Sequence, residues 1–359
     1  MLDRNSHVPL YCQLAEEIKR QILAGEINPG DKLLSESEMM RAYDIGRLTV
    51  RQALAQLVNK GYLAKEHGRG TFCKSSFSAD DMLNIDVILD MEDTYFIPYY
   101  IKSISAVLKA GGCNFIISDS KNSTSEICSL LRNIYEKGTD GVILQPSHID
   151  EAPSHELEEC FRMYRHAGIP CIMIDCMYDI QDASYLILDE YRGGYLVAEY
   201  LHGLGHKKTM VAYVDGYKDS VQRKIGFCRA CEEMSAEAPV LLPYDPAKGI
   251  ADTGFMDILK AQGITGIFCY NDEVAVECIR ILQNNGFRVP EDISVFGYDD
   301  SVLASACVPP LTTIAHPKEK LGTLAAETLL DMIRKEHYDP FVKMFAPSLV
   351  ERGSCGTAG

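Results

Sequence analysis

The sequence lacks any long apolar run. Nowhere do 18 apolar residues follow one another in its 359 residues, and a membrane-spanning helix needs about 20. Residues Met1 to His7 are polar, so we expect no secretory signal and no contact with a membrane. With 47% apolar and 24% charged residues, the chain is not disordered, collagen-like or coiled-coil. We expect a cytoplasmic globular protein of two or three domains.

The cysteines form no recognisable framework. The chain has 13 of them, an odd number that cannot pair fully within one chain, and without an export signal they are expected to be reduced. Cys228 and Cys231 are spaced like a metal or redox pair. They have no second pair and no His cluster nearby, so we assign them to helix packing. We predict no metal site and no cofactor.

Positive charge is scarce and unevenly placed. Lys and Arg number 35 against 51 Asp and Glu, a net charge of −16. Residues 1–74 nevertheless carry 11 basic against 9 acidic residues, and residues 44–74 carry 6 against 2. An acidic body with one basic segment suits a protein that touches nucleic acid only through its N-terminal end.

Three short helices are predicted in residues 1–74. Leu or Ile recurs every four positions from Leu10 to Ile22, which gives one apolar stripe of a helix. Ser35 and Glu38 have the spacing of a capping box and begin a second helix. A third helix is predicted from Arg47 to Lys60, with Gly61 directly after it.

The third predicted helix has two faces. Val50, Leu54 and Leu57 should pack inward. The polar residues at its N-terminal end suit a recognition helix, whose Arg side chains can pair bidentately with guanine in the major groove. Taken alone, the same residues could form a solvated face. The candidate DNA-binding residues on this helix are Arg47, Thr49, Arg51 and Gln52.

A hairpin is predicted after the third helix. Two short strands flank a Gly-containing tip at residues 67–70. His67, Gly68 and Arg69 at this tip could enter a minor groove or contact phosphate; an ordinary hairpin with a polar turn is the alternative. Three helices followed by such a hairpin make a winged helix-turn-helix, which favours DNA binding.

These residues resemble the GntR-type winged helix. The resemblance implies that Arg47, Thr49 and Arg51 contact DNA from the recognition helix, and His67, Gly68 and Arg69 from the wing. Leu34 and Gly46 depart from the family's usual Pro and Ser. The motifs that carry the resemblance are Pro9-Leu-Tyr-x-Gln13, Ser35-Glu36, Arg47-x-Thr49-Val50-Arg51, Gly61-Tyr62-Leu63 and Gly68-x-Gly70-Thr71-Phe72.

Residues 75–83 form a predicted linker, and a larger region, 84–355, follows it. Apolar strand-like runs alternate there with helical patterns, which predicts parallel sheets covered by helices. The fold class is therefore α/β, with two lobes rather than one sheet. The predicted strands are 85–89, 114–118, 141–144, 170–174, 185–188, 209–213, 266–269 and 293–296, and the helices are 98–110, 125–137, 155–167, 191–203, 221–233, 272–285 and 318–334.

Polar residues stand at the carboxyl ends of these strands, where ligands bind in open parallel sheets. Several carboxylates, one Arg, an Asn and aromatic rings suit a neutral polyol better than a phosphate. The alternative is that each Asp only caps the following helix, and Asp272 is the clearest such case. The candidate effector-binding residues are Tyr95, Phe96, Asp175, Arg223, Asn271, Asp272 and Asp300.

This second region resembles the LacI-type sugar-responsive domain. The resemblance implies a periplasmic-binding-protein type 1 fold of two Rossmann-like lobes, with lobe 1 at about 84–177 and 316–338 and lobe 2 at about 178–315 and 339–355. It also implies ligand contacts at Arg223, Asp272 and Asp300. The motifs include Gly168-Ile-Pro170, Asp189-x-x-x-Gly193-Gly194, Arg223-x-x-Gly226-Phe227, Tyr270-Asn271-Asp272 and Gly297-Tyr-Asp-Asp300.

A GntR-type head on a LacI-type body resembles the AraR group of arabinose repressors. That resemblance implies a homodimeric repressor that leaves double-stranded operator DNA when it binds L-arabinose. Another pentose, a hexose or a nucleoside is the alternative effector, and a sugar-transport binding protein is the alternative function. No Schiff-base Lys or phosphate cup is found, so we expect no enzyme.

Overall fold

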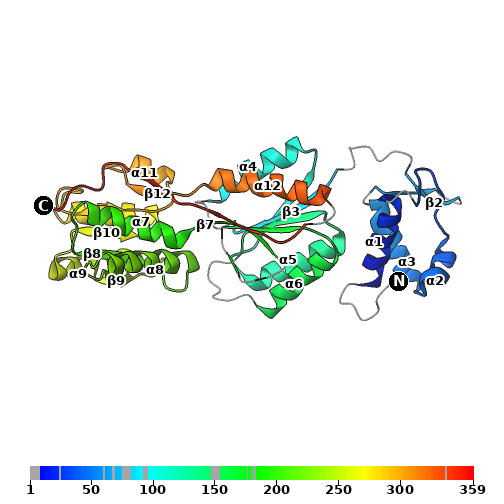
Figure 1. Cartoon of the computed structure of the whole chain (residues 1–359), viewed down its shortest axis with the longest axis horizontal. Coiled ribbons are helices and arrows are strands. Elements are labelled where there is room, and N and C mark those ends of the chain that lie inside the picture. The colour runs from blue at the N-terminus through cyan, green and yellow to red at the C-terminus, as the bar shows by residue number, and fades with distance from the viewer. Residues whose placement is uncertain are drawn as a thin grey trace.

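The computed structural model describes residues 9–23, 26–59, 61–66, 69–74, 82–91, 96–146, 154–175, 177–178, 180, 183–335 and 338–359. Three helices and a hairpin come first, followed by strands and helices in alternation. This order confirms the predicted α/β class. Figure 1 shows the head, formed by the first elements of the chain, and the two sheet-containing lobes of the body.

The head is a winged helix. Its helices enclose a core that includes Leu14, Ile18, Val50 and Leu57. The predicted capping box is present, because the Glu38 amide donates to Ser35 Oγ (3.3 Å) and the Ser35 amide to the Glu38 carboxylate (2.7 Å). The elements are α1 (Leu10–Leu23), α2 (Glu36–Tyr43), α3 (Arg47–Asn59) and the antiparallel strands β1 (Leu63–Glu66) and β2 (Gly70–Cys73).

Lobe 1 is a parallel sheet between two helical layers. Its strands run in the order β13-β7-β6-β5-β3-β4. Helices α4 (Ile97–Ala110) and α12 (Lys318–Arg334) lie on one face, and α5 (Thr124–Lys137) and α6 (His155–His166) lie on the other (Figure 1). The strands are β3 (Asn84–Leu89), β4 (Asn114–Asp119), β5 (Gly141–Leu144), β6 (Cys171–Ile174), β7 (Ser184–Leu188) and β13 (Val342–Phe345).

Lobe 2 repeats this plan with a smaller parallel sheet of order β11-β10-β8-β9. An antiparallel pair, β12 (Thr313–Ala315) and β14 (Ser348–Val350), lies beside it. The sheet strands are β8 (Thr209–Tyr213), β9 (Val240–Pro243), β10 (Gly266–Cys269) and β11 (Ser294–Phe296). The helices are α7 (Glu190–Gly203), α8 (Lys218–Glu233), η1 (Ile250–Thr253), α9 (Phe255–Gln262), α10 (Asp272–Asn284) and α11 (Val302–Ala306).

The boundary between the lobes differs from the predicted one. Strand β7 pairs with β6, and β13 pairs with β7, so residues 184–188 and 342–345 belong to the sheet of lobe 1 and not to lobe 2. The chain crosses between lobes after β7, after β12 and after β13. Hydrophobic pattern places strands along the chain but carries no information on strand pairing, which is why the sequence misplaced this boundary.

Helices α7 and α8 pack with their backbones in contact. A Cβ atom on Gly194 would lie 1.8 Å from the carbonyl oxygen of Arg223, and one on Gly226 would lie 1.9 Å from that of Tyr191. Only glycine fits at either position. This close approach sets the position of Arg223 within lobe 2.

The cysteines of the described residues are free thiols, and most of them are buried. Cys231 lies inside the packed face of α8, where its Sγ is 3.4 Å from His202 Nε2, and Cys228 is half-buried. In the part of the chain that the structure describes, no helix has the length and apolar character to cross a membrane.

Substituting Gly194 tests the α7–α8 contact. We expect Gly194→Ala to lower the free energy of unfolding by about 1–3 kcal/mol or more, because the added methyl group forces the two backbones apart. Urea unfolding of the full chain measures the change. Gly203→Ala is the matched control on α7, since a Cβ there meets no atom within 4 Å. Equal stability of the two variants would contradict the packing described here.

Candidate functional site

The exposed face of α3 carries the predicted DNA-contacting residues. Arg47, Arg51 and Gln52 are exposed and Thr49 is half-buried. The opposite face is buried against α1, with Val50 at 0%, Leu54 at 7% and Leu57 at 1% exposure. The predicted two-faced helix is therefore present. Its polar face points outward, as contact with a DNA groove requires.

Arg51 is held by the helix before it. Its Nε donates to both carboxylate oxygens of Glu36, at 3.1 and 3.0 Å. Glu36 is the first residue of α2, so this contact fixes the direction of the guanidinium relative to α2 and α3. The sequence reasoning missed Glu36, although its place directly after Ser35 was part of the motif.

The wing is described only in part. His67 and Gly68 lie outside the described residues. Arg69 is exposed, pairs with Glu66 (2.5 Å between Nη1 and Oε2) and lies 5.6 Å from the ring centre of Phe72. Arg69 is thus on the hairpin, as predicted.

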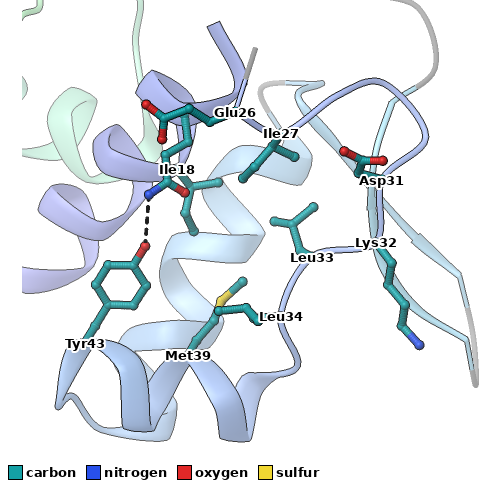
Figure 2. A pocket seen from close by; sticks show the side chains of 10 residues that line it. Ile18, Glu26, Ile27, Asp31, Lys32, Leu33, Leu34, Met39 and Tyr43 are labelled. Carbon is teal, nitrogen blue, oxygen red and sulfur yellow. Dashed lines mark hydrogen bonds between the residues drawn. The ribbon is translucent and has the colours of Figure 1, made fainter. Parts of the chain in front are cut away.

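A hollow of about 340 Å³ lies elsewhere in the head, between α1, α2 and the segment that joins them (Figure 2). Core side chains such as Ile18, Leu33 and Met39 form its walls, and the Gln21 amide donates to Tyr43 Oη across 3.4 Å. None of the predicted DNA-contacting residues lines it. We therefore assign it no part in DNA contact.

The second group of interest stands at the carboxyl ends of the two parallel sheets, where the lobes meet. We call it the inter-lobe cluster. Its residues from lobe 1 are Asp90, Phe96, Gln145, Asp175, His316 and Lys318, and those from lobe 2 are Glu190, Arg223, Asn271, Asp272, Asp299 and Asp300. Tyr95, the remaining predicted effector-binding residue, lies outside the described residues.

Arg223 is the buried centre of the lobe 2 side. Its Nε and Nη2 donate to the Glu190 carboxylate (2.7 and 3.1 Å), and its Nη1 donates to the Tyr270 carbonyl (2.5 Å). Asp299 lies 3.4 Å away and the Tyr298 ring 3.7 Å away. Burial lowers the pKa of Arg223, but the two carboxylates outweigh it and raise the pKa well above its usual value. Arg223 therefore orders its neighbours from inside lobe 2.

Asn271, and not Asp272, caps α10, because its side chain accepts from the Val274 amide. The Asp272 carboxylate instead accepts from the Ser301 amide (2.7 Å) and the Thr313 hydroxyl (2.6 Å). Burial raises the pKa of Asp272. Asp272 thus ties α10 to the segment after β11 and to strand β12, and it does not cap α10.

Neighbouring aspartates follow β11 and have different surroundings. Asp300 accepts from Arg352 Nη2 at 2.6 Å and is partly exposed. Asp299 is 1% exposed and faces Arg223. The sequence analysis predicted Asp300 as an effector-binding residue. In the structure it is Asp299 that lies beside the guanidinium of Arg223. Glu190 was missed as well, since its position at the start of α7 marks it as an ordinary first-turn acid.

The lobe 1 side is a row of polar side chains and one aromatic ring in contact with one another. Gln145 Oε1 accepts from the Asp90 amide (3.4 Å), and Gln145 Nε2 donates to Asp175 (3.2 Å). Asp175 also lies 2.8 Å from His316 Nε2. The Phe96 ring packs edge-on against His316 at 4.9 Å between ring centres. Asp175 and Phe96, both predicted effector-binding residues, thus each contact His316.

Lys318 joins the two lobes. From the first turn of α12 in lobe 1, its Nζ donates to the main-chain oxygen of Asp299 in lobe 2. The same ammonium lies 5.1 Å from the ring centre of Phe96. Burial lowers the pKa of Lys318, and nearby carboxylates including Asp299 and Asp272 oppose that shift. This side chain therefore links the lobe 1 and lobe 2 sides of the cluster.

The cluster offers mainly hydrogen-bond acceptors, two amides and one ring face. Such a set binds vicinal hydroxyls through carboxylate and amide groups, while an aromatic ring covers the apolar face of a sugar. Among the described residues, no group of three or more His, Cys, Asp or Glu is arranged to hold a metal ion.

Comparison with known proteins agrees with both halves of the chain. Residues 10–73 match the gntR family of bacterial regulatory proteins, and residues 198–355 match a periplasmic binding protein-like domain. An arabinose metabolism transcriptional repressor of Halalkalibacterium halodurans is 30% identical, over 97% of each chain. The chain belongs to this family of repressors. A repressor of the same name from Geobacillus stearothermophilus is 28% identical over 97% of this chain and 98% of its own.

Solved structures match the body of this repressor. A LacI family regulator from Enterococcus faecalis with bound ribose is 28% identical, with a TM-score of 0.65 over 77% of this chain and all of its own. One from Enterococcus faecium, also with ribose, is 26% identical with a TM-score of 0.64. The chain is a sugar-responsive transcriptional repressor with a DNA-binding head, and its named relatives are repressors rather than enzymes.

The buried Asp299 predicts a pH dependence. Burial raises the pKa of Asp299 from 3.8 to about 7, although Arg223 opposes the shift. Between these two values the folded chain keeps the proton that the unfolded chain has lost, so raising the pH lowers stability. We expect Asp299→Asn to remove this pH-dependent loss of stability, which reaches about 4 kcal/mol for a pKa difference of this size.

Urea unfolding of wild type and Asp299→Asn at pH 5 and pH 7.5 measures the contribution of Asp299 to stability. The wild type should lose more stability over this interval than the variant does. Asp300→Asn is the matched control at the partly exposed neighbour and should lose as much stability between these pH values as wild type. If the free energy of unfolding changes equally with pH in wild type and Asp299→Asn, the buried Asp299 carboxyl does not keep its proton as described.

Proposed function

We propose that the inter-lobe cluster binds L-arabinose and that this binding releases the head from operator DNA. The observation that carries the proposal is the match to arabinose metabolism repressors over 97% of the chain, which includes both the head and the body. The acceptor-rich cluster with the Phe96 ring supports a neutral sugar. Its several carboxylates would repel a phosphorylated one.

The sugar contacts divide by lobe. From lobe 1, Asp175 accepts from hydroxyl groups, Phe96 covers the apolar face of the ring, and Tyr95 supplies a further sugar contact. From lobe 2, Asn271 and Asp299 hydrogen-bond hydroxyl groups. Arg223, Asp272 and Asp300 keep their predicted place in the site, and their contacts to Glu190, Thr313 and Arg352 add a positioning role.

D-Ribose is a second candidate effector. The Enterococcus faecalis regulator, 28% identical to this chain, holds ribose. Pentoses differ in the direction of single hydroxyl groups, so exchange of a few polar side chains separates one sugar from another.

On the DNA side, Arg47, Thr49, Arg51 and Gln52 of α3 enter a major groove, and His67, Gly68 and Arg69 of the wing contact the neighbouring minor groove or its phosphates. A homodimer places two heads on two half-sites of double-stranded DNA. The protein works in the cytoplasm without a cofactor and catalyses no reaction.

Release requires that the sugar bind differently to two states of the body. Asp175 of lobe 1 and Asn271 of lobe 2 contact the sugar from opposite sides, so the lobes close on it. This closure alters the spacing of the two heads in the dimer. A coupling of about 1–3 kcal/mol changes operator occupancy by roughly five- to 150-fold.

An exposed apolar patch on lobe 2 supports the dimer. Val302 and Leu303 of α11 are 66% and 39% exposed, and Val308 directly after α11 is 76% exposed. The Gln283 amide donates to the Val308 carbonyl, which fixes this segment against α10. Exposed apolar side chains that gather on one surface mark protein–protein contacts, and we assign the dimer contact to this segment.

Separate variants should uncouple the two activities. Arg51→Ala should weaken operator binding by about five- to 150-fold, the cost of one base-contacting Arg, and leave sugar affinity unchanged. Arg223→Lys should keep operator binding and lose release, because Lys cannot hold Glu190 and the Tyr270 carbonyl together. Gel shifts on DNA selected by the wild type, with and without L-arabinose, measure both effects.

Calorimetric titration of the full chain with L-arabinose, D-ribose, D-xylose, D-glucose and adenosine identifies the effector. L-Arabinose should bind most tightly and should be the sugar that releases DNA. Tighter binding of D-ribose would replace arabinose by the second candidate. An Arg223→Lys protein that folds and releases normally would refute the assigned role of Arg223.

A charge in the apolar patch should separate the dimer. We expect Val308→Asp to shift the chain to monomer, because a buried unpaired carboxylate is costly at an interface, and to weaken binding to a two-half-site duplex. Analytical ultracentrifugation measures the mass. Leu241→Asp on β9, at a side chain 44% exposed, is the control. A dimeric Val308→Asp protein would place the interface elsewhere.

A further inference from the structure

An apolar side chain stands on the outward face of the recognition helix. From Arg47 to Val58, where the structure describes the side chains of α3, the exposed residues lie along one side of the helix: Arg47, Leu48, Arg51, Gln52 and Ala55. Leu48 is 71% exposed. It therefore lies in the same outward stripe as the two guanidinium groups.

Leu48 has no part in the core of the head. Val50, Leu54 and Leu57 provide the apolar contacts of α3, with exposures of 0%, 7% and 1%. A single exposed Leu is common on protein surfaces. This one, however, lies in the first turn of the helix, next to Arg47 and Thr49, and the N-terminal residues of a recognition helix are those that meet base edges.

The major groove offers one apolar group at base edges, the C5 methyl of thymine. We propose that Leu48 contacts a thymine methyl in each half-site and so sets a thymine preference beside the base pair contacted by Arg47. This inference depends on the proposed operator binding of the head and adds a base identity to it. A side chain without donors or acceptors can distinguish thymine from the other bases only through that methyl.

Replacing thymine by deoxyuridine removes the methyl and keeps base pairing, so it isolates the contact. Duplexes are selected from random DNA with the sugar-free full chain, and each thymine of the selected site is then replaced singly. At one thymine per half-site, we expect wild type to lose about four-fold in affinity, the value of one buried methyl group. Leu48→Ala should bind the thymine and deoxyuridine duplexes equally. Fluorescence anisotropy measures both.

Leu48→Met, which keeps an apolar side chain, should retain the difference between the two duplexes. Leu34→Ala is the matched control, an exposed apolar residue of the head outside α3, and should behave as wild type. If wild type and Leu48→Ala respond identically to every replacement, the proposed contact is wrong while operator binding stands. A selection that enriches no sequence would overturn operator binding and this contact together.

Discussion

The buried guanidinium of Arg223 connects the parts of lobe 2 that face lobe 1. It bonds to the first residue of α7, to the carbonyl that follows β10 and to the aspartate that follows β11. Two glycine contacts between α7 and α8 bring it there. Removing a charge from such a group leaves its partners buried without compensation, so the shape of this edge of the sheet depends on one side chain.

At the junction between the lobes, this network of lobe 2 faces a set of polar contacts from lobe 1. On the lobe 1 side, Gln145 donates to Asp175, whose carboxylate lies 2.8 Å from His316 Nε2, and the Lys318 ammonium donates to the other lobe. The contacts from Lys318 to the main chain of lobe 2 are among those that a relative movement of the lobes would change. A ligand that adds contacts across the junction can then favour one arrangement over another.

Much of the fold, and part of the candidate site, could be predicted from the sequence for physical reasons. Apolar periodicity placed the winged helix and the strands that alternate with helices, because local patterns dictate local structure. The short edge strands β9, β12, β13 and β14 were missed; half-exposed strands such as β13 lack a continuous apolar run. Asp299 and Glu190 were missed because pairing with Arg223 depends on where separate segments meet, which no local pattern records. Motif resemblance named Arg223 and Asp272 but not the partners that hold them.

The three crossings between the lobes have an evolutionary implication. The head is joined to the body by one stretch of chain, between β2 and β3, whereas each lobe is assembled from segments on both sides of the other. A recombination event at one point can therefore exchange the head and leave the body whole, but no single breakpoint can exchange one lobe. New operator specificity can be acquired by domain shuffling in this architecture, while a new effector must arise by substitution within an intact body.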